Sequence, residues 1–428
     1  MTSNNLFQMQ ATQIQTLLAQ RGINAVVWRG TLAPRLLQFV LTVGPKTDPN
    51  AVKRLSEPIA MALGVTDVDI SRQGATIRID IPRRDPQAVS FPALMEYVGE
   101  LQPYTALIGM DADATALVLR FDSPAVAHAL IAGTTGSGKS NFLRSVALSM
   151  AQNTSPDALR IAIVDIGEKG LGTLDGLPHL WRPIATEPNA AGALLAHVAQ
   201  EMEVRRSQDR IDSRIVLFVD ELVEMLRFGG ADMIRCLEHI VTQGLKHGIH
   251  LVAATQKPMA SDVGSIAKAN FPTRVLFRVM SGDDALVAAG CSGTDAHKLL
   301  GLGDGILITC GQKTRFQAPL VSDPRKSVES ICKKYPTNGG NGQTIDATAW
   351  REQMAAHLPD YHPPVNGGGR RRKPVPDALI ACILRERGRG DTMPSTRAVR
   401  KLHKRMYGKD MAGRRVKEAL ALAERRLA

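Results

Sequence analysis

The chain of 428 residues has few aromatic side chains, scattered cysteines and no long apolar run. Aromatic residues make up only 4% of the sequence, which leaves few surfaces on which the bases of single-stranded nucleic acid could stack. The five cysteines form neither a C-x-x-C pair nor a cluster with histidine at metal-ligand spacing, which disfavours zinc sites and disulfide frameworks. No run approaches the roughly 18 apolar residues that span a bilayer, and the N-terminus lacks the features of a secretory signal. We therefore expect a cytoplasmic protein without membrane insertion.

Acidic residues are scarce in one segment, the C-terminal residues 370–428. This segment holds 18 Lys and Arg against 6 Asp and Glu, whereas the preceding 369 residues hold 35 of each kind. The net charge of +12 therefore belongs entirely to the tail. A solvated basic face is the ordinary explanation of a charge run, but this density over a whole segment favours a polyanionic partner.

The most informative motif is the run Gly-Thr-Thr-Gly-Ser-Gly-Lys-Ser at residues 133–140, which has the form G-x-x-x-x-G-K-[ST]. It lies between the apolar stretch 129–132 and a helical pattern, the context that a phosphate loop requires and a mere glycine-rich turn does not. Backbone N–H groups and the helix N-terminus would bind the phosphates of ATP, the lysine would reach the β- and γ-phosphates, and Ser140 would hold Mg²⁺. The expected nucleotide-binding residues are Gly133, Thr134, Thr135, Gly136, Ser137, Gly138, Lys139, Ser140 and Asn141.

Two further signals favour hydrolysis of the bound nucleotide. The apolar run 215–219 ends in Asp220 and Glu221, of which the first can hold Mg²⁺ and the second can activate a water molecule. Two acidic residues after a strand can also simply begin a helix, so the pair gains weight from the phosphate loop upstream. The run 251–256 ends in Gln256, a candidate γ-phosphate sensor, although polar residues after strands are common. The expected catalytic residues are Lys139, Glu221 and Gln256.

The pattern of apolar, Gly/Pro-rich and basic stretches divides the chain into four segments, and the first two should contain β-sheets. Residues 1–103 should form a small α+β domain, and residues 104–335 a phosphate-loop ATPase motor domain, whose apolar runs predict buried parallel strands joined by helical crossovers. In the small domain, strands are expected at 23–28, 36–43 and 76–81 and a helix at 50–63. In the motor domain, strands are expected at 129–132, 161–164, 215–219, 251–254, 275–279 and 306–309.

The last two segments are a linker and the basic tail. Residues 336–369 are rich in Gly and Pro and read as a flexible linker with a short helix at 348–357. The pattern of residues 370–428 predicts an all-α, helix-turn-helix-like DNA-binding domain. The alternative is a basic helical hairpin that does not recognise bases. The expected DNA-contacting residues are Arg397, Arg400, Lys401, Lys404, Arg405, Arg414, Arg415 and Lys417.

Several runs resemble the motor domain of the FtsK/SpoIIIE DNA translocases, part of the FtsK-HerA superfamily of phosphate-loop ATPases. The matching runs are 132–140, Leu-Pro-His-Leu at 177–180, Glu-Met-x-x-Arg-Arg at 201–206, 248–258, 266–279 and 298–305. The resemblance covers roughly residues 30 to 320, and its upstream part, 37–82, is similar to the small domain that precedes the motor in that family. It implies a RecA-like, mainly parallel sheet and a homohexameric ring that threads double-stranded DNA, driven by ATP hydrolysis at subunit interfaces.

The sequence departs from this family at two points. Residues 165–169 read Asp-Ile-Gly-Glu-Lys where the family usually has Asp-Pro-Lys. An arginine that the family often has just before the Gly-Ile-His-Leu run, implied to act across the subunit interface, is replaced by Leu245. We expect Arg274, Arg278 or Lys246 to supply the trans-acting charge, with a purely structural role as the equal alternative.

The function that these patterns favour is an ATP-driven double-stranded DNA translocase that acts as a ring. An ATP-switched DNA-binding or assembly factor with slow turnover is the alternative, and a single-stranded DNA helicase is a third reading that the low aromatic content disfavours.

Overall fold

The computed structural model describes residues 3–44, 47–83, 85–167, 170–256, 271–336 and 350–357, together with residues 399 and 420. The chain divides into two units, residues 1–363 and 364–428. The DNA-contacting residues expected in the tail and most of the expected linker lie outside the described residues, and the expected short helix is α11 (Trp350–His357). Within the described part, no helix is both long and apolar enough to cross a bilayer.

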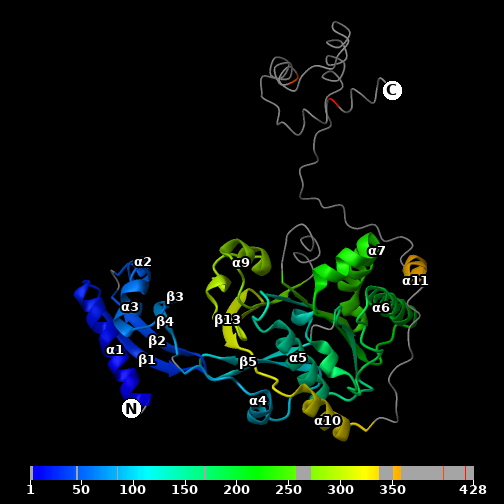
Figure 1. Cartoon of the computed structure of the whole chain (residues 1–428), viewed down its shortest axis with the longest axis horizontal. Coiled ribbons are helices and arrows are strands. Elements are labelled where there is room, and N and C mark those ends of the chain that lie inside the picture. The colour runs from blue at the N-terminus through cyan, green and yellow to red at the C-terminus, as the bar shows by residue number, and fades with distance from the viewer. Residues whose placement is uncertain are drawn as a thin grey trace. The chain divides into compact units, whose positions relative to one another are not determined.

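A four-stranded antiparallel sheet is formed near the N-terminus (Figure 1). The sheet has the order β1-β2-β4-β3, and the expected helix at 50–63 is two helices that break at Arg54 and Leu55. Its elements are α1 (Ser3–Gln20), β1 (Ala25–Leu32), β2 (Leu36–Val43), α2 (Pro49–Lys53), α3 (Ser56–Leu63), β3 (Asp69–Gln73) and β4 (Thr76–Pro82). Alternation in β4 puts Ile77, Ile79 and Ile81 in a core with α1 and α3, which leaves Arg78 and Asp80 on the other face of the sheet.

A nine-stranded sheet forms the centre of the rest of this unit, in the order β6-β5-β13-β12-β11-β7-β10-β9-β8. Five neighbouring strands, β8, β9, β10, β7 and β11, are parallel, and β12, β13, β5 and β6 extend the sheet with antiparallel pairs. Its strands are β5 (Thr105–Asp111), β6 (Ala116–Arg120), β7 (Ala129–Ala132), β8 (Leu159–Val164), β9 (Arg214–Val219), β10 (Ile249–Thr255), β11 (Thr273–Leu276), β12 (Asp304–Thr309) and β13 (Gln312–Gln317).

The prediction of a parallel strand at 306–309 was wrong, because β12 runs antiparallel to β11. The reason is a hairpin: β12 and β13 are joined by Cys310 and Gly311, which have φ values of 49° and 75°. Two successive residues with positive φ are the geometry of a type I′ turn, which matches the twist of paired antiparallel strands. The sheet is therefore mixed.

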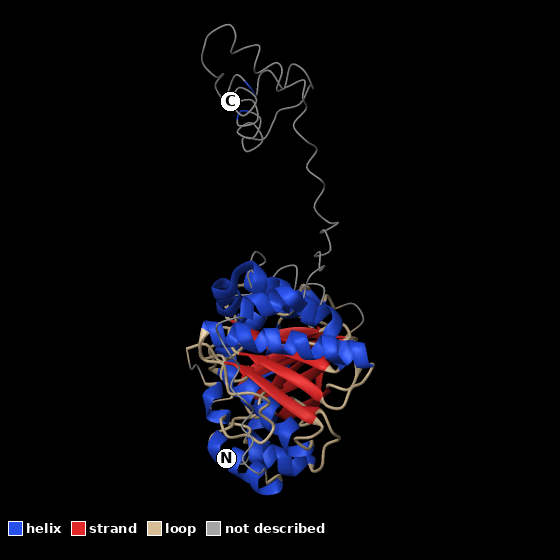
Figure 2. Cartoon of the chain, turned by 90° about the vertical axis from the view of Figure 1, so that its right-hand side faces the viewer, coloured by secondary structure: helices blue, strands red, loops and turns tan. Residues whose placement is uncertain are grey.

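Helices cover both faces of the nine-stranded sheet (Figure 2). Alternate residues of the buried strands point to opposite faces, so Ile131 packs in the layer with α5 and Leu130 packs in the layer with α6 and α7. One layer contains α4 (Phe91–Val98), α5 (Lys139–Asn153) and α10 (Pro324–Lys334), and the other contains α6 (Pro188–Gln208), α7 (Leu222–Gln243) and α11. The helix α7 is broken at Gly230, where φ is 63° and ψ is −147°.

The remaining helical elements are short. They are α9 (Gly282–Ala289), which packs with β11, and the single turns η1 (Pro124–Val126), η2 (Leu171–Leu174), η3 (Gly244–His247) and η4 (Ala296–Lys298).

Candidate active site

The candidate site lies at the carboxyl edge of the parallel strands. The phosphate loop follows β7, Asp220 and Glu221 follow β9, and Thr255 and Gln256 lie at the end of β10, which pairs with both β7 and β9. Because parallel strands end at one edge of a sheet, three motifs meet there, including residues as far apart in the chain as Thr135 and Gln256, which are 121 residues apart. The structure thus brings together the expected phosphate, metal and catalytic residues.

The phosphate loop is packed against another backbone segment. Gly138 has a φ of 117°, and a Cβ built there would lie 2.7 Å from the backbone nitrogen of Gly303. The N–H of Gly303 donates a hydrogen bond to the carbonyl of Ser137 at 2.8 Å. Only glycine fits Gly138, because a side chain would meet both a disfavoured dihedral and a close backbone contact. The loop therefore depends on the turn at 301–303.

Lys139 is the first residue of α5, and its side chain lies within the loop. It is only 6% exposed, and its Nζ donates to the carbonyl oxygens of Gly133 at 2.8 Å and Thr134 at 3.0 Å. Burial lowers the pKa of this ammonium group, while the nearby carboxylates of Glu221 and Asp220 raise it. A cation is thus held where phosphate oxygens would approach the helix N-terminus.

Ser140 and Asp220, the expected metal-binding residues, lie within hydrogen-bonding distance of each other. The Ser140 hydroxyl lies 3.0 Å and 2.9 Å from the two carboxylate oxygens of Asp220, which is buried. Among the described residues, no group of three His, Cys, Asp or Glu side chains could hold a metal by itself. A hydroxyl and one carboxylate fit Mg²⁺, which keeps several waters and takes phosphate oxygens as further ligands.

Glu221 and Gln256 are connected to each other and to the phosphate loop. The Glu221 carboxylate accepts hydrogen bonds from the Thr255 hydroxyl at 3.1 Å and from the Gln256 N–H at 3.3 Å. The side-chain oxygen of Gln256 accepts a hydrogen bond from the Thr135 hydroxyl at 2.8 Å. Glu221 and Gln256, two of the three expected catalytic residues, therefore lie together beside the phosphate loop.

The three candidates for a trans-acting cation occupy different environments. Arg274 is 8% exposed and donates to the carbonyl of Ala288 at 2.9 Å, so it fastens β11 to the end of α9. Arg278 is exposed, and its carbonyl accepts the N–H of Thr134 at 2.8 Å. Lys246 is exposed in η3, at the amino end of β10 and thus roughly 20 Å along the strand from Gln256. The contacts of Arg274 favour the structural alternative for that residue.

Sequence reasoning missed two polar residues beside the site. Asp165, buried at the end of β8, accepts hydrogen bonds from the backbone N–H groups of Gly170, Leu171 and Gly172, which orders the start of η2. Arg144, one turn into α5, donates to the carbonyl of Ser140 at 3.3 Å. Burial lowers the pKa of Arg144, while Asp220 and Asp165 raise it. For Asp165, the signal available in the sequence was an acidic residue directly after a predicted strand.

Comparison with protein families identifies two regions of the chain. Residues 1–83 match the FtsK alpha domain, and residues 100–212 match the FtsK/SpoIIIE family. The second match contains the phosphate loop and ends before Asp220. Two parts of the chain are thus similar to this family, in agreement with the resemblance found in the sequence.

Curated relatives agree with these matches. The DNA translocase FtsK of Staphylococcus epidermidis is 27% identical over 355 residues, which cover 75% of this chain and 44% of the relative. The DNA translocase SftA of Bacillus subtilis is 29% identical over 343 residues, which cover 73% of this chain and 36% of the relative. The chain therefore spans less than half the length of either protein.

Solved structures share the fold. The cytoplasmic domain of the Thermomonospora curvata type VII secretion ATPase EccC superposes with a TM-score of 0.51 at 21% identity, covering 65% of this chain and 36% of that one. The pCW3 conjugation coupling protein TcpA, a monomer form with ATPγS, superposes with a TM-score of 0.50 at 17% identity, covering 75% and 99%. The expected α/β fold of a phosphate-loop ATPase is confirmed.

Proposed function

We propose that the chain, parts of which match the FtsK alpha domain and the FtsK/SpoIIIE family, is a double-stranded DNA translocase that hydrolyses ATP and works as a ring of six subunits. The observation that carries the proposal is the convergence of the phosphate loop, the Ser140–Asp220 pair, Glu221 and Gln256 at one sheet edge. The curated relatives are named DNA translocases, which supports DNA as the substrate.

In this proposal the residues have separate roles in hydrolysis. Lys139 and the loop N–H groups bind the phosphates, and Ser140 and Asp220 would hold a Mg²⁺ ion, which would supply charge neutralisation at the phosphates. Glu221 orients the attacking water and takes its proton, since it is the carboxylate beside the loop that does not pair with Ser140. Gln256, hydrogen-bonded to Thr135, registers whether a γ-phosphate is present.

A ring would supply the positive charge that stabilises the phosphoryl transition state. Arg278 and Lys246 are both exposed, so a neighbouring subunit could receive either of them. Such a charge contributes roughly 10³ to 10⁵ in rate in other phosphate-loop enzymes. The basic tail, residues 370–428, would dock the ring on DNA through phosphate contacts.

One observation supports the slow-turnover alternative, an ATP-switched DNA-binding factor. The Glu221 carboxylate is engaged by Thr255 and Gln256, so its action on water requires these hydrogen bonds to rearrange. A factor that rarely makes this rearrangement would bind ATP and hydrolyse it slowly.

One experiment separates the two functions. The ATPase rate is measured with and without linear duplex DNA, alongside displacement of a triplex-forming strand from the same duplex. A translocase gives DNA-stimulated turnover and strand displacement that both need ATP, whereas a switch binds the duplex with ATP and displaces nothing. Absence of strand displacement despite full ATPase stimulation would contradict translocation.

A further inference from the structure

The turn at residues 301–303 lies between the phosphate loop and the small four-stranded sheet. Its three residues, Gly301, Leu302 and Gly303, have φ values of 74°, 51° and 90°. A left-handed conformation is costly for leucine, so the contacts around the turn have to hold it there. On one side of the turn, the N–H of Gly303 donates to the carbonyl of Ser137 at 2.8 Å. The phosphate loop is therefore hydrogen-bonded to a turn that depends on its neighbours for its conformation.

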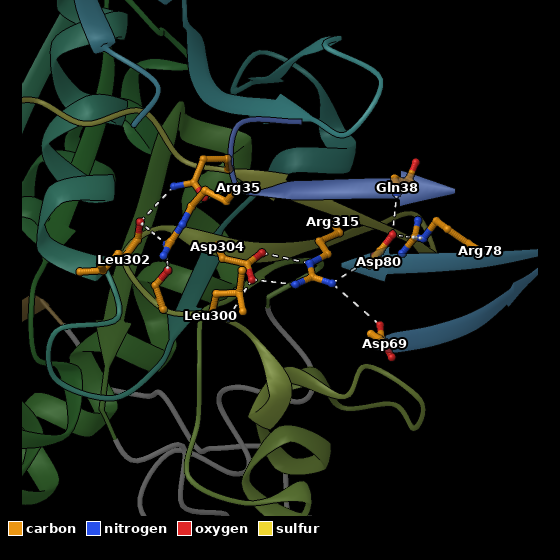
Figure 3. Close-up of polar contacts among 11 residues, drawn as sticks. Arg35, Gln38, Asp69, Arg78, Asp80, Leu300, Leu302, Asp304 and Arg315 are labelled. Carbon is orange, nitrogen blue, oxygen red and sulfur yellow. Dashed lines mark hydrogen bonds and ion pairs between the residues drawn. The ribbon is translucent and has the colours of Figure 1, made fainter. Parts of the chain in front are cut away.

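One of these neighbours is Arg35, which lies outside the nine-stranded sheet (Figure 3). Arg35 directly precedes β2 of the small sheet, and its Nη1 donates to the carbonyls of Gly301 at 2.5 Å and Leu302 at 3.4 Å. Gln317, the last residue of β13, donates to the same Leu302 carbonyl at 3.0 Å. The carbonyls of the turn are thus held by one side chain from each sheet.

The backbone around Arg35 is itself fixed by hydrogen bonds. The carbonyl of Arg35 accepts the N–H of Arg83 at 2.9 Å, and the carbonyl of Pro34 accepts the N–H of Gln87 at 2.8 Å. Because the guanidinium extends from a hydrogen-bonded segment, less conformational freedom is lost when it binds the two carbonyls.

Arg315 fixes the ends of the same turn (Figure 3). It pairs with Asp304, which directly follows the turn, at 2.8 Å and with Asp80 of β4 at 3.2 Å. The Asp304 carboxylate also accepts the N–H of Leu300, just before the turn, at 2.8 Å. The two ends are therefore held through Asp304, whereas Arg35 holds the carbonyls within the turn.

We infer that Arg35 is a positioning residue of the nucleotide site. It acts through the turn at 301–303, whose contacts with Ser137 and Gly138 keep the phosphate-loop backbone in the conformation that binds phosphates. The inference rests on the proposed nucleotide-binding function and assigns part of it to the connection between β1 and β2. Because positioning and binding are linked, a bound triphosphate in turn strengthens the contact between Arg35 and the turn.

The first test removes the hydrogen-bond donor at Arg35. Binding of ATPγS and of inorganic tripolyphosphate, each with Mg²⁺, is measured by calorimetry on the full chain, on Arg35→Met and on Arg35→Lys. We expect Arg35→Met to weaken both ligands by at least about fivefold, because a hydrogen bond from a charged donor is strong enough to shift binding by that factor. Arg35→Lys keeps a cationic donor, so it should bind both ligands within about threefold of the unaltered chain.

The matched control is Arg72→Met. Arg72 lies on β3 of the small sheet and donates to the carbonyl of Gly74 at 2.8 Å, so it holds the turn between β3 and β4. This variant should bind both ligands within about twofold of the unaltered chain. Unchanged binding in Arg35→Met, or an equal loss in Arg72→Met, would overturn the inference. A loss for ATPγS alone would also overturn it, because that result would place Arg35 against the nucleoside and not behind the loop.

A second measurement needs no substitution, so it applies even if Arg35→Met does not fold. Amide hydrogen exchange of the unaltered chain is followed by mass spectrometry with and without ATPγS and Mg²⁺. Binding should slow exchange in peptides that cover residues 33–36 and 301–304 and leave exchange in α3 unchanged. Slower exchange at 301–304 without any change at 33–36 would overturn the inference. If the unaltered chain binds neither ligand, the proposed function itself fails, which differs from a loop that binds nucleotide without Arg35.

Discussion

Replacing Arg315 with methionine should strongly destabilise the chain, because this guanidinium joins two buried carboxylates. It makes two charge-assisted hydrogen bonds to Asp304, at 3.0 and 2.8 Å, and one to Asp80 at 3.2 Å. The side chains of these aspartates are 5% and 1% exposed. Burial opposes the charge on Arg315, but the carboxylates outweigh it and raise its pKa. Removing one member of a buried ion pair typically costs about 3–5 kcal/mol, since the remaining charges stay desolvated.

The control is another arginine that binds an aspartate through two hydrogen bonds, but at the surface. Arg120 pairs with Asp122 in this way, with side chains 54% and 27% exposed, and solvent screens such an exposed pair, so it contributes little to stability. Urea unfolding followed by circular dichroism should therefore show a much larger loss for Arg315→Met than for Arg120→Met. Equal losses for the two variants would refute the reasoning that burial of the carboxylates makes the Arg315 network valuable.

The same variant should show a characteristic pH dependence. The pKa of Asp69 is already raised, by burial and by the neighbouring Asp80, while Arg315 opposes that rise. Without Arg315 the folded-state pKa of Asp69 rises further above its unfolded-state pKa. The ionised carboxylate of Asp69 then destabilises the fold at pH values above the folded-state pKa. This loss of stability becomes smaller as the pH falls and Asp69 is protonated. The stability gap between Arg315→Met and the unaltered chain should therefore narrow as the pH falls from 8 to 5. A gap that widens over this range would contradict the assignment.

Three further predictions concern the proposed motor. Lys139→Ala should abolish tight ATP binding, whereas Glu221→Gln should keep ATP binding and lose hydrolysis. Nucleotide titration measures the binding and phosphate release measures the hydrolysis. Normal turnover in Glu221→Gln would show that Glu221 has no catalytic role. Removing residues 370–428 should weaken DNA binding and flatten its salt dependence, while the basal ATPase rate stays unchanged. The reason is that each phosphate contact contributes about 0.9 to the slope of log affinity against log salt concentration. An unchanged slope would assign the phosphate contacts to the rest of the chain. An excess of Lys139→Ala protein mixed with active protein should lower DNA-stimulated ATP turnover more than simple dilution does. If subunit exchange is verified and turnover is still strictly proportional to the fraction of active protein, that result would argue against a ring.

The grouping of the candidate site residues could be predicted from the sequence because its signals are local. The phosphate loop, the Asp220–Glu221 pair and Gln256 each follow an apolar strand, and the parallel arrangement of those strands places their ends together. The antiparallel half of the sheet was missed for the opposite reason. A short apolar run such as 306–309 has the same appearance whether its neighbour is parallel or antiparallel, and the turn at Cys310 and Gly311 is the only local sign of the difference.

The hydrogen bonds that join the small sheet to the nine-stranded sheet had no local signal in the sequence. Arg315 and Asp80 are 235 residues apart in the chain, and nothing in either segment marks them as partners. Arg35 likewise lies 266 residues from Gly301, whose carbonyl it binds. Such pairs follow only from the tertiary arrangement of two sheets, which a single sequence does not specify through periodicity or spacing.

The break in α7 determines which part of the molecule controls Glu221. Glu221 is the residue from which α7 begins, so its carboxylate direction is set by the first helical segment, residues 222–229. At Gly230 the backbone leaves helical φ and ψ, and the longer second segment follows after this kink. Because the short first segment is fastened to the core by Leu222, Met225 and Leu226, a displacement of the second segment can be absorbed at Gly230 without turning the Glu221 carboxylate.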